Sequence, residues 1–157
     1  MSLKLLQGDL VHLLLGKNAH IPTEKALEGI EPDNRHVRPM DPMNTIWEEL
    51  EHLRIAQEDI IHYTQEASWV SPEFPAGLWP KPVDRVTDEM WDSSLSAFMA
   101  DLNKLIAIVQ ESEWDLTQEI LHGEGRTYLR QVLLVADHNA YHIGQIVLIR
   151  KILGNWP

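Results

Sequence analysis

The sequence predicts an all-α protein, a four-helix bundle of long antiparallel helices, although the very long loop between the second and third helices leaves the topology open. Apolar residues recur at steps of three and four along four long segments, which is the spacing of one face of a helix, and no segment alternates as a strand does. Most of the prolines gather in two other segments, 31–43 and 69–86, where they exclude regular helix. At 157 residues and without a cysteine, the chain matches a single domain, residues 1–157, large enough to fold without disulfides.

The first helix is predicted close to the N-terminus, with Gly16 and Asn18 at its end. Its apolar positions share one helix face, and they are Leu3, Leu6, Leu10, Leu13 and Leu14. A short helix is predicted over residues 23–29, and the chain then becomes irregular over residues 31–43.

The second helix begins with a capping box, in which Thr45 and Glu48 each satisfy a backbone N–H of the first turn. It continues to about Ala67. Its apolar face, the predicted core contact, carries Ile46, Leu50, Leu53 and Ile60. A different face carries His52, Ala56, Asp59 and Tyr63.

A long loop, residues 69–86, separates the second and third helices. Its prolines are interleaved with three large aromatic residues, Trp69, Phe74 and Trp79. Loops of this length inside a compact domain are usually functional or disordered, and the aromatic residues argue against disorder. Two interpretations are open: a lid or wall that packs over the bundle, and a rigid surface brace.

The last two helices have clear start signals in Thr87 and Thr127. The third helix carries a continuous apolar stripe that we assign to the core, Trp91, Leu95, Phe98, Leu102, Leu105 and Val109. The last helix runs to about Leu153, where Gly154 ends it. Because it has apolar residues on two opposite faces, we expect both of its sides to be covered by protein.

Two histidines, His138 and His142, lie four residues apart inside the last helix. Their imidazoles therefore project from one helix face about 5–6 Å apart, which suits two ligands of one metal ion. Leu134, Gln145 and Ile149 flank them, so both rings should point into protein or a cleft. Their four ring nitrogens need partners there, which a metal with nearby acceptors would supply. The alternative is a hydrogen-bonded pair without a metal. Since the chain has no cysteine, nitrogen and oxygen are the available metal ligands.

Charge and hydropathy exclude some partners. The formal net charge of −11 would repel a phosphate backbone, and the Lys and Arg residues are scattered, so we expect no nucleic-acid partner. No stretch approaches the roughly 18 apolar residues of a membrane span, and polar residues interrupt the leucine-rich N-terminal segment. The expectation is a cytoplasmic protein without a membrane partner.

Two parts of the chain carry a resemblance to a known family. One is Val-Ala-Asp-His-Asn-Ala-Tyr-His-Ile-Gly-Gln at 135–145 with the tail at 148–156, and the other is Ile-Trp-Glu-Glu-Leu-Glu-His-Leu-Arg at 46–54. Over roughly residues 45–157 the chain resembles the DinB-like (YfiT-like) superfamily of damage-inducible bacterial bundle proteins, which is distinct from the DNA polymerase of similar name. The resemblance implies a four-helix bundle that holds a divalent metal, nickel or zinc, through one histidine of the second helix and two of the last. By position these are His52, His138 and His142, and His52 rests on the resemblance alone.

Three histidine ligands leave open positions on a metal, which is typical of a catalytic site. Relatives transfer low-molecular-weight thiols such as bacillithiol, or isomerise with mycothiol. The resemblance therefore implies a metal-dependent thiol S-transferase first and a hydrolase second, acting on a small-molecule substrate with a low-molecular-weight thiol as cosubstrate. Asn139 stands where the zinc-peptidase motif has its glutamate, which disfavours peptidase activity. The alternative is a non-catalytic metal-binding or stress-response module, because no unambiguous general base lies near the predicted ligands.

Glu48, one turn before His52, and Gln145, nearly one turn after His142, are the polar groups best placed beside the metal. Their plainer interpretations are a capping acid and a surface amide. Trp156 closes the chain on an expected apolar patch, and many relatives pair through bundle faces, so we expect a homodimer. The remaining histidines have no spacing that pairs them and are expected to be ordinary surface or capping residues, namely His12, His20, His36, His62 and His122.

Overall fold

A computed structural model gives the fold and describes residues 3–111 and 115–157. Four long helices form the bundle, α1 (Leu3–Leu14), α3 (Ile46–Gln65), α4 (Asp88–Gln110) and α5 (Tyr128–Ile152). Three short elements lie between them, α2 (Thr23–Leu27) and the 3₁₀ helices η1 (Pro32–Asn34) and η2 (Ala76–Leu78). Within these residues there is no strand, only an isolated bridge between Glu119 and Thr127. The all-α prediction is confirmed.

Threonine caps begin three of the long helices. Thr45 and Glu48 form a complete capping box at the start of α3, and Thr87 and Thr127 accept hydrogen bonds from backbone N–H groups of the first turns of α4 and α5. These helices begin where the sequence predicts, because a cap is a local interaction that needs no distant partner. Gly154, with a φ of +74°, follows the end of α5 in the left-handed conformation that favours glycine.

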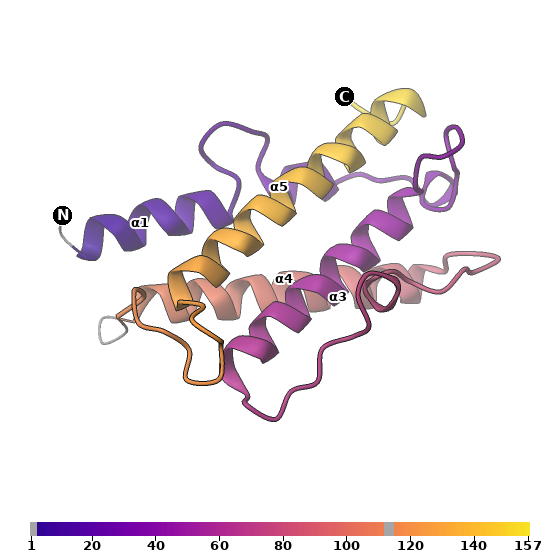
Figure 1. Ribbon diagram of the computed structural model, residues 1–157. Helices are drawn as coiled ribbons and strands as arrows, with labels where there is room; N and C mark the ends of the chain where they lie inside the picture. The colour runs from indigo at the N-terminus through magenta and orange to yellow at the C-terminus, as the bar shows by residue number, and fades with distance from the viewer. Residues whose placement is uncertain (1–2, 112–114) are drawn as a thin grey trace.

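The order of the helices corrects one expectation. Helix α3 packs against both α4 and α5, and α1 packs against α4 and α5. Figure 1 shows α3 and α4 running in the same direction, so the long helices are not all antiparallel to their chain neighbours. Residues 66–87 make this possible, since they return the chain from the end of α3 to the end at which α3 began. On its way, η2 lies against α3.

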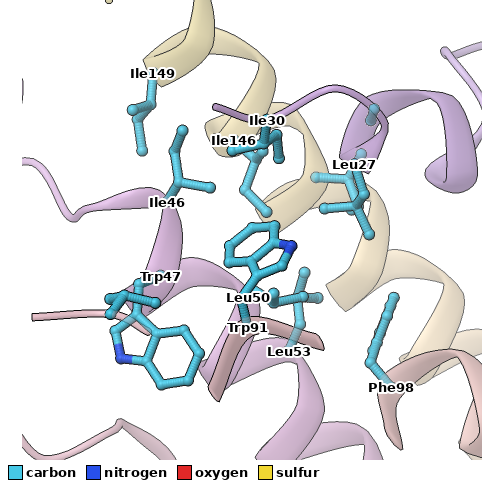
Figure 2. Close-up of a cluster of buried hydrophobic side chains, with 13 residues drawn as sticks. Leu27, Ile30, Ile46, Trp47, Leu50, Leu53, Trp91, Phe98, Ile146 and Ile149 are labelled. Atoms are coloured by element: carbon cyan, nitrogen blue, oxygen red, sulfur yellow. The ribbon is translucent and has the colours of Figure 1, made fainter. Parts of the chain in front are cut away.

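Two buried hydrophobic clusters fill the bundle. The cluster drawn in Figure 2 lies where α2 and the first half of α3 meet α4 and the second half of α5, with Trp47 and Trp91 as its largest members. Arg35 packs against this cluster, because its guanidinium lies over the Trp91 ring. The same guanidinium pairs with Asp88 at 2.7 Å. The second cluster joins α1 to the other ends of α3, α4 and α5. Together they hold α3 and α5 side by side, which positions the site described below.

The outer side of α5 is less covered than its two apolar faces predict. Leu133, Leu148 and Ile152 remain 43%, 46% and 45% exposed, because α1 and α3 pack on its other sides. By length and hydropathy alone, α5 is long and apolar enough to cross a membrane, but 44% of its most apolar window is buried in the bundle. A core helix meets the same criterion, so this is weak evidence for a membrane span.

Candidate metal centre

The interface between α3 and α5 brings three histidines together. His52 of α3 and His142 of α5 are buried, and His138 is half-buried. Each offers one ring nitrogen, and these nitrogens lie within 4.8 Å of one another. The Nε2 atoms of His52 and His138 are 3.0 Å apart. The spacing of four residues places His138 and His142 on one face, as the sequence predicts, and the packing of α3 on α5 supplies the third ring.

His52 is fixed by the long loop between α3 and α4. Its Nδ1 atom lies 2.7 Å from the backbone carbonyl of Leu78, which accepts its proton. The Trp79 ring stacks on the imidazole, with centroids 3.9 Å apart and planes 4° from parallel. The structure thus places part of this loop as a wall of the site.

His142 is oriented by Glu49, a residue that was not among the site residues predicted from the sequence. Nδ1 of His142 donates to Oε2 of Glu49 at 2.6 Å, and Oε1 of Glu49 accepts from the side-chain amide of Asn44 at 2.7 Å. Glu49 is only 3% exposed, so these two bonds offset the loss of water around its charge. One signal was available in the sequence, because Glu49 precedes His52 by three residues and shares its helix face.

The protonation of the three rings leaves nitrogen lone pairs aimed inward. When Nδ1 of His52 and Nδ1 of His142 both donate, the Nε2 atoms of these neutral rings are acceptors. His138 can give a proton to one of them, and at least one acceptor then stays without a donor from this cluster. The Nδ1 atom of His138 is itself buried without a partner. A cation would satisfy all three inward lone pairs at once.

Two of the rings, those of His138 and His52, have a lowered pKa, which favours their neutral form near pH 7. Burial is the main cause that lowers the pKa of His138 to about 4, and the neighbouring His142 and His52 lower it further, while the Asn139 side chain opposes the shift. Burial also lowers the pKa of His52, which its bond to the Leu78 carbonyl partly offsets. Neutral imidazole is the form that binds metal ions.

The donor set fits a divalent transition metal. When two nitrogens each bind one zinc ion at about 2.0–2.1 Å, and the N–Zn–N angle is about 90–109°, the nitrogens lie about 2.9–3.4 Å apart. The 3.0 Å between the Nε2 atoms of His52 and His138 falls in that range, and the ligand nitrogens of all three rings lie within 4.8 Å of one another. Three nitrogen donors, two of them oriented by a carbonyl and a carboxylate, match the environment in which zinc or nickel is bound.

A cavity of about 290 Å³ lies beside His142, which lines it, whereas His52 and His138 do not. Glu49, Trp79, Tyr141 and Gln145 also line it. The other lining residues are Pro42, Met43, Asn44 and Ile149. A small molecule in this cavity would therefore contact His142 directly.

Comparison with known proteins agrees with the site. The family model of the DinB superfamily matches residues 22–146, most of the chain, including all three histidines. The chain belongs to the DinB superfamily. Neither the curated proteins nor the solved structures compared with it gave a match. The three clustered histidines of this member could hold a metal ion.

The two polar candidates from the sequence lie in different surroundings. The carboxylate of Glu48 accepts from the Thr45 backbone N–H and pairs with Arg38 at 2.6 Å, so it serves the capping box. The glutamate that bonds to a histidine of the cluster is Glu49, and not the neighbouring candidate Glu48. Gln145 is half-buried and lines the cavity beside His142.

Asn139 lies between two metal-site residues in sequence but points elsewhere. Its side-chain amide donates to Oε1 of Gln57 at 2.9 Å, and Gln57 in turn donates to the Phe98 carbonyl at 2.7 Å. This chain of bonds joins α5, α3 and α4. No carboxylate occupies the position of the zinc-peptidase base, as the sequence indicated.

The remaining histidines lie outside the centre. His12, His20 and His36 are exposed. His62 stacks on Trp69 and bonds to Glu66, and His122 donates to the Tyr63 carbonyl. The exposure of His12, His20 and His36 agrees with the surface role expected of them, whereas His62 and His122 are half-buried and bonded within the chain.

Trp156 is half-buried and lies over Arg150 and Lys151 of its own chain. The indole is therefore engaged within the molecule. The homodimer expected from this residue stays a prediction.

Proposed function

We propose that His52, His138 and His142 hold one divalent cation, zinc or nickel, with positions left open for a substrate. The observation that carries this proposal is the set of three inward ring nitrogens, since the metal-free cluster leaves at least one of them without a donor. Leu78 and Glu49 would keep the rings of His52 and His142 in the metal-binding tautomer.

We further propose that the protein is a metal-dependent enzyme, a low-molecular-weight thiol S-transferase in the first place and a hydrolase in the second. A cation at this site would supply a Lewis acid that lowers the pKa of a thiol, or of water in hydrolysis. In S-transfer the thiol loses its proton, its sulfur forms a bond to an electrophilic carbon, and the leaving group departs with its electron pair. The thiol must come from a cosubstrate, because the chain has no cysteine.

This chain's own residues would bind and orient the reactants. The cavity beside His142 offers apolar contacts from Trp79 and Tyr141 and hydrogen bonds from Asn44 and Gln145. The stacked Trp79 excludes water from one side of His52. Glu49 is already committed to His142 and Asn44, so we do not assign it as the general base.

The test compares four proteins in one assay. Metal-stripped wild type is loaded with zinc or nickel and mixed with a panel of small thiols and electrophiles, beside His142→Ala, Gln145→Ala and the exposed control His36→Ala. We expect turnover that requires metal in wild type and His36→Ala, and a loss of at least about a hundredfold in His142→Ala. Absence of metal-dependent turnover with every thiol would remove the S-transferase proposal, and ester hydrolysis would then be assayed.

A second candidate function is a non-catalytic metal-binding module. It is favoured by the absence, among the described residues beside the three rings, of an uncommitted carboxylate to act as a base. In this case metal removal lowers the melting temperature, while thiols and esters leave it unchanged. A true substrate would raise the melting temperature of the loaded protein by mass action.

We also propose that the protein acts in the cytoplasm as a homodimer. The partly exposed apolar residues on the outer side of α5 support the dimer, since they offer a surface for a second copy. Sedimentation should show a species of twice 18.1 kDa at micromolar concentration. A monomer alone would refute the dimer and leave the metal proposal intact.

A further inference from the structure

The segment between α3 and α4, residues 66–85, is held to the bundle by few contacts, and we call it the strap. None of its residues is buried, and the apolar side chains of Val70 and Phe74 remain 86% and 83% exposed. Segments that bury little surface open locally at a low cost in free energy. The position of the strap on α3 therefore depends on a small number of specific contacts.

Two tryptophans of the strap each stack on a histidine of α3. Trp69 stacks on His62 with ring centroids 4.4 Å apart, and its indole N–H donates to Asp59 at 2.8 Å. Trp79 stacks on His52 with ring centroids 3.9 Å apart. The two pairs have the same chemistry, but only the second includes a residue of the three-histidine cluster. One end of the strap thus rests on a candidate metal ligand, and the other end does not.

The contacts of the strap set the direction of the His52 ring. The Leu78 carbonyl accepts the Nδ1 proton at 2.7 Å, which leaves Nε2 as the atom that faces His138. The Trp79 ring lies 4° from parallel with the imidazole, so it resists tilting of the imidazole plane. The same indole meets the His142 ring edge to face, with centroids 5.9 Å apart. Rotation of His52 away from the other two rings would therefore break both of its contacts with the strap.

We propose that Trp79 and the Leu78 carbonyl are the positioning groups of His52, and that the closed strap and a cation at the three histidines stabilise each other. This inference rests on the proposed metal site. A partner at the outer nitrogen of a ligating imidazole fixes its tautomer and orientation and raises its basicity, so the closed strap strengthens cation binding. Linkage then requires the cation to favour the closed strap by the same factor. Because Trp79 also lines the cavity beside His142, opening of the strap removes one wall of the space assigned to the substrate.

Amide hydrogen exchange of the full-length wild type, with and without zinc, measures the closing of the strap. The reporters are the N–H groups of Gly77, Leu78 and Trp79, which bond to carbonyls within the strap. The controls are the N–H groups of Asn34 and Arg35, which form a similar short turn in η1. We expect zinc to slow exchange of the reporters about tenfold and to leave the controls within about twofold.

The other outcomes separate the inference from the metal site. Zinc binding without slower exchange of the reporters would overturn the inference and identify the strap as a rigid brace. Equal slowing of reporters and controls would show general stabilisation of the fold and would overturn it as well. A wild type that binds no zinc in a chelator titration would overturn the proposed metal site itself.

Matched tryptophan variants test the positioning role of Trp79. Trp79→Ala should weaken zinc binding about tenfold in the chelator titration, because His52 loses the ring that orients it, and zinc should no longer slow exchange at Gly77 and Leu78. Trp69→Ala removes the same side chain from the other stacked pair and should keep zinc affinity within about twofold of wild type. Trp79→Phe retains an aromatic face and should recover most of the affinity. Equal zinc affinities of Trp79→Ala and Trp69→Ala would overturn the role of Trp79.

Discussion

Two buried polar regions lie next to each other where α3 meets α5, and they differ in how well they are satisfied. The bonds of Gln57 join α3 to the Phe98 carbonyl of α4 and to Asn139 of α5 within the bundle. His52 and His142 turn their outer nitrogens to Leu78 and Glu49, the outer nitrogen of His138 is buried without a partner, and the inner nitrogens of the three rings face one another. The bonds of Gln57 in the first region link three helices of the fold, whereas we propose that a cation completes the second region.

The division falls between adjacent residues. His138 and Asn139 are neighbours in sequence, but about 100° separates successive side chains around a helix, so one faces the cluster and the other the core. Unsatisfied buried polar groups are few in native proteins, and each requires an explanation. We conclude that the rotation of successive side chains around α5 separates the candidate metal ligand His138 from the structural residue Asn139. The following variants test that separation.

Removal of one histidine should have the largest effect. In His142→Ala the cluster loses one of its three nitrogens, and we expect metal affinity to fall by at least about a hundredfold. Elemental analysis and a competitive chelator titration measure the change, with His36→Ala as control. Retention of full affinity in His142→Ala would place the metal elsewhere.

Glu49→Gln should have the next largest effect. The variant keeps the size of the side chain and removes the charge that orients His142, and loss of such a partner typically weakens metal binding by about 10–100-fold. The same chelator titration applies. Glu49 would lose its assigned role if the variant bound metal as tightly as wild type.

Gln57→Leu should separate the two regions. It leaves the Asn139 amide nitrogen without its acceptor and should lower the free energy of unfolding by about 1–3 kcal/mol. Urea unfolding measures this loss. Metal affinity of the folded variant should stay within about threefold of wild type, and a parallel loss of metal would show that the regions are not separate.

Acid should destabilise the metal-free protein through His138. The pKa of His138 is about 4 in the folded protein against an ordinary 6.5, so between these values the unfolded chain binds a proton that the folded chain refuses. Its contribution to stability is fully present above pH 6.5 and is lost as the pH falls towards 4. Urea unfolding across this range should show a shallower decline in His138→Gln, and identical slopes would contradict the pKa assignment.

Glu48→Ala should have the smallest effect. It removes half of the capping box and an exposed ion pair with Arg38, for a loss of about 1 kcal/mol or less. Metal affinity should not change, because Glu48 is held away from the histidines. A tenfold drop in affinity would restore Glu48 as a partner of the centre.

The sequence was sufficient to predict the features that depend on a single helix. The caps at Thr45, Thr87 and Thr127 and the shared face of His138 and His142 depend on spacing within one segment. The burial of His52 and Glu49 could not be predicted in this way, because it depends on how α3 is rotated against α5. The parallel course of α3 and α4 was also missed, because no periodicity records the direction of a helix relative to its neighbours.

The contribution of the long loop could not be foreseen in detail. Proline and aromatic content predicted that residues 69–86 would be irregular and ordered, but left a wall and a brace equally open. The bond from His52 to the Leu78 carbonyl and the stacking of Trp79 are long-range contacts. Such contacts follow from the packed structure and not from local pattern.

X-ray absorption at the metal edge of loaded wild-type protein tests the central claim most directly. We predict one ion per chain with three imidazole nitrogens at about 2.0–2.1 Å and at least one further light-atom ligand from solvent. Fewer than three imidazoles, or a spectrum that the triple variant of His52, His138 and His142 to Ala reproduces, would contradict the account.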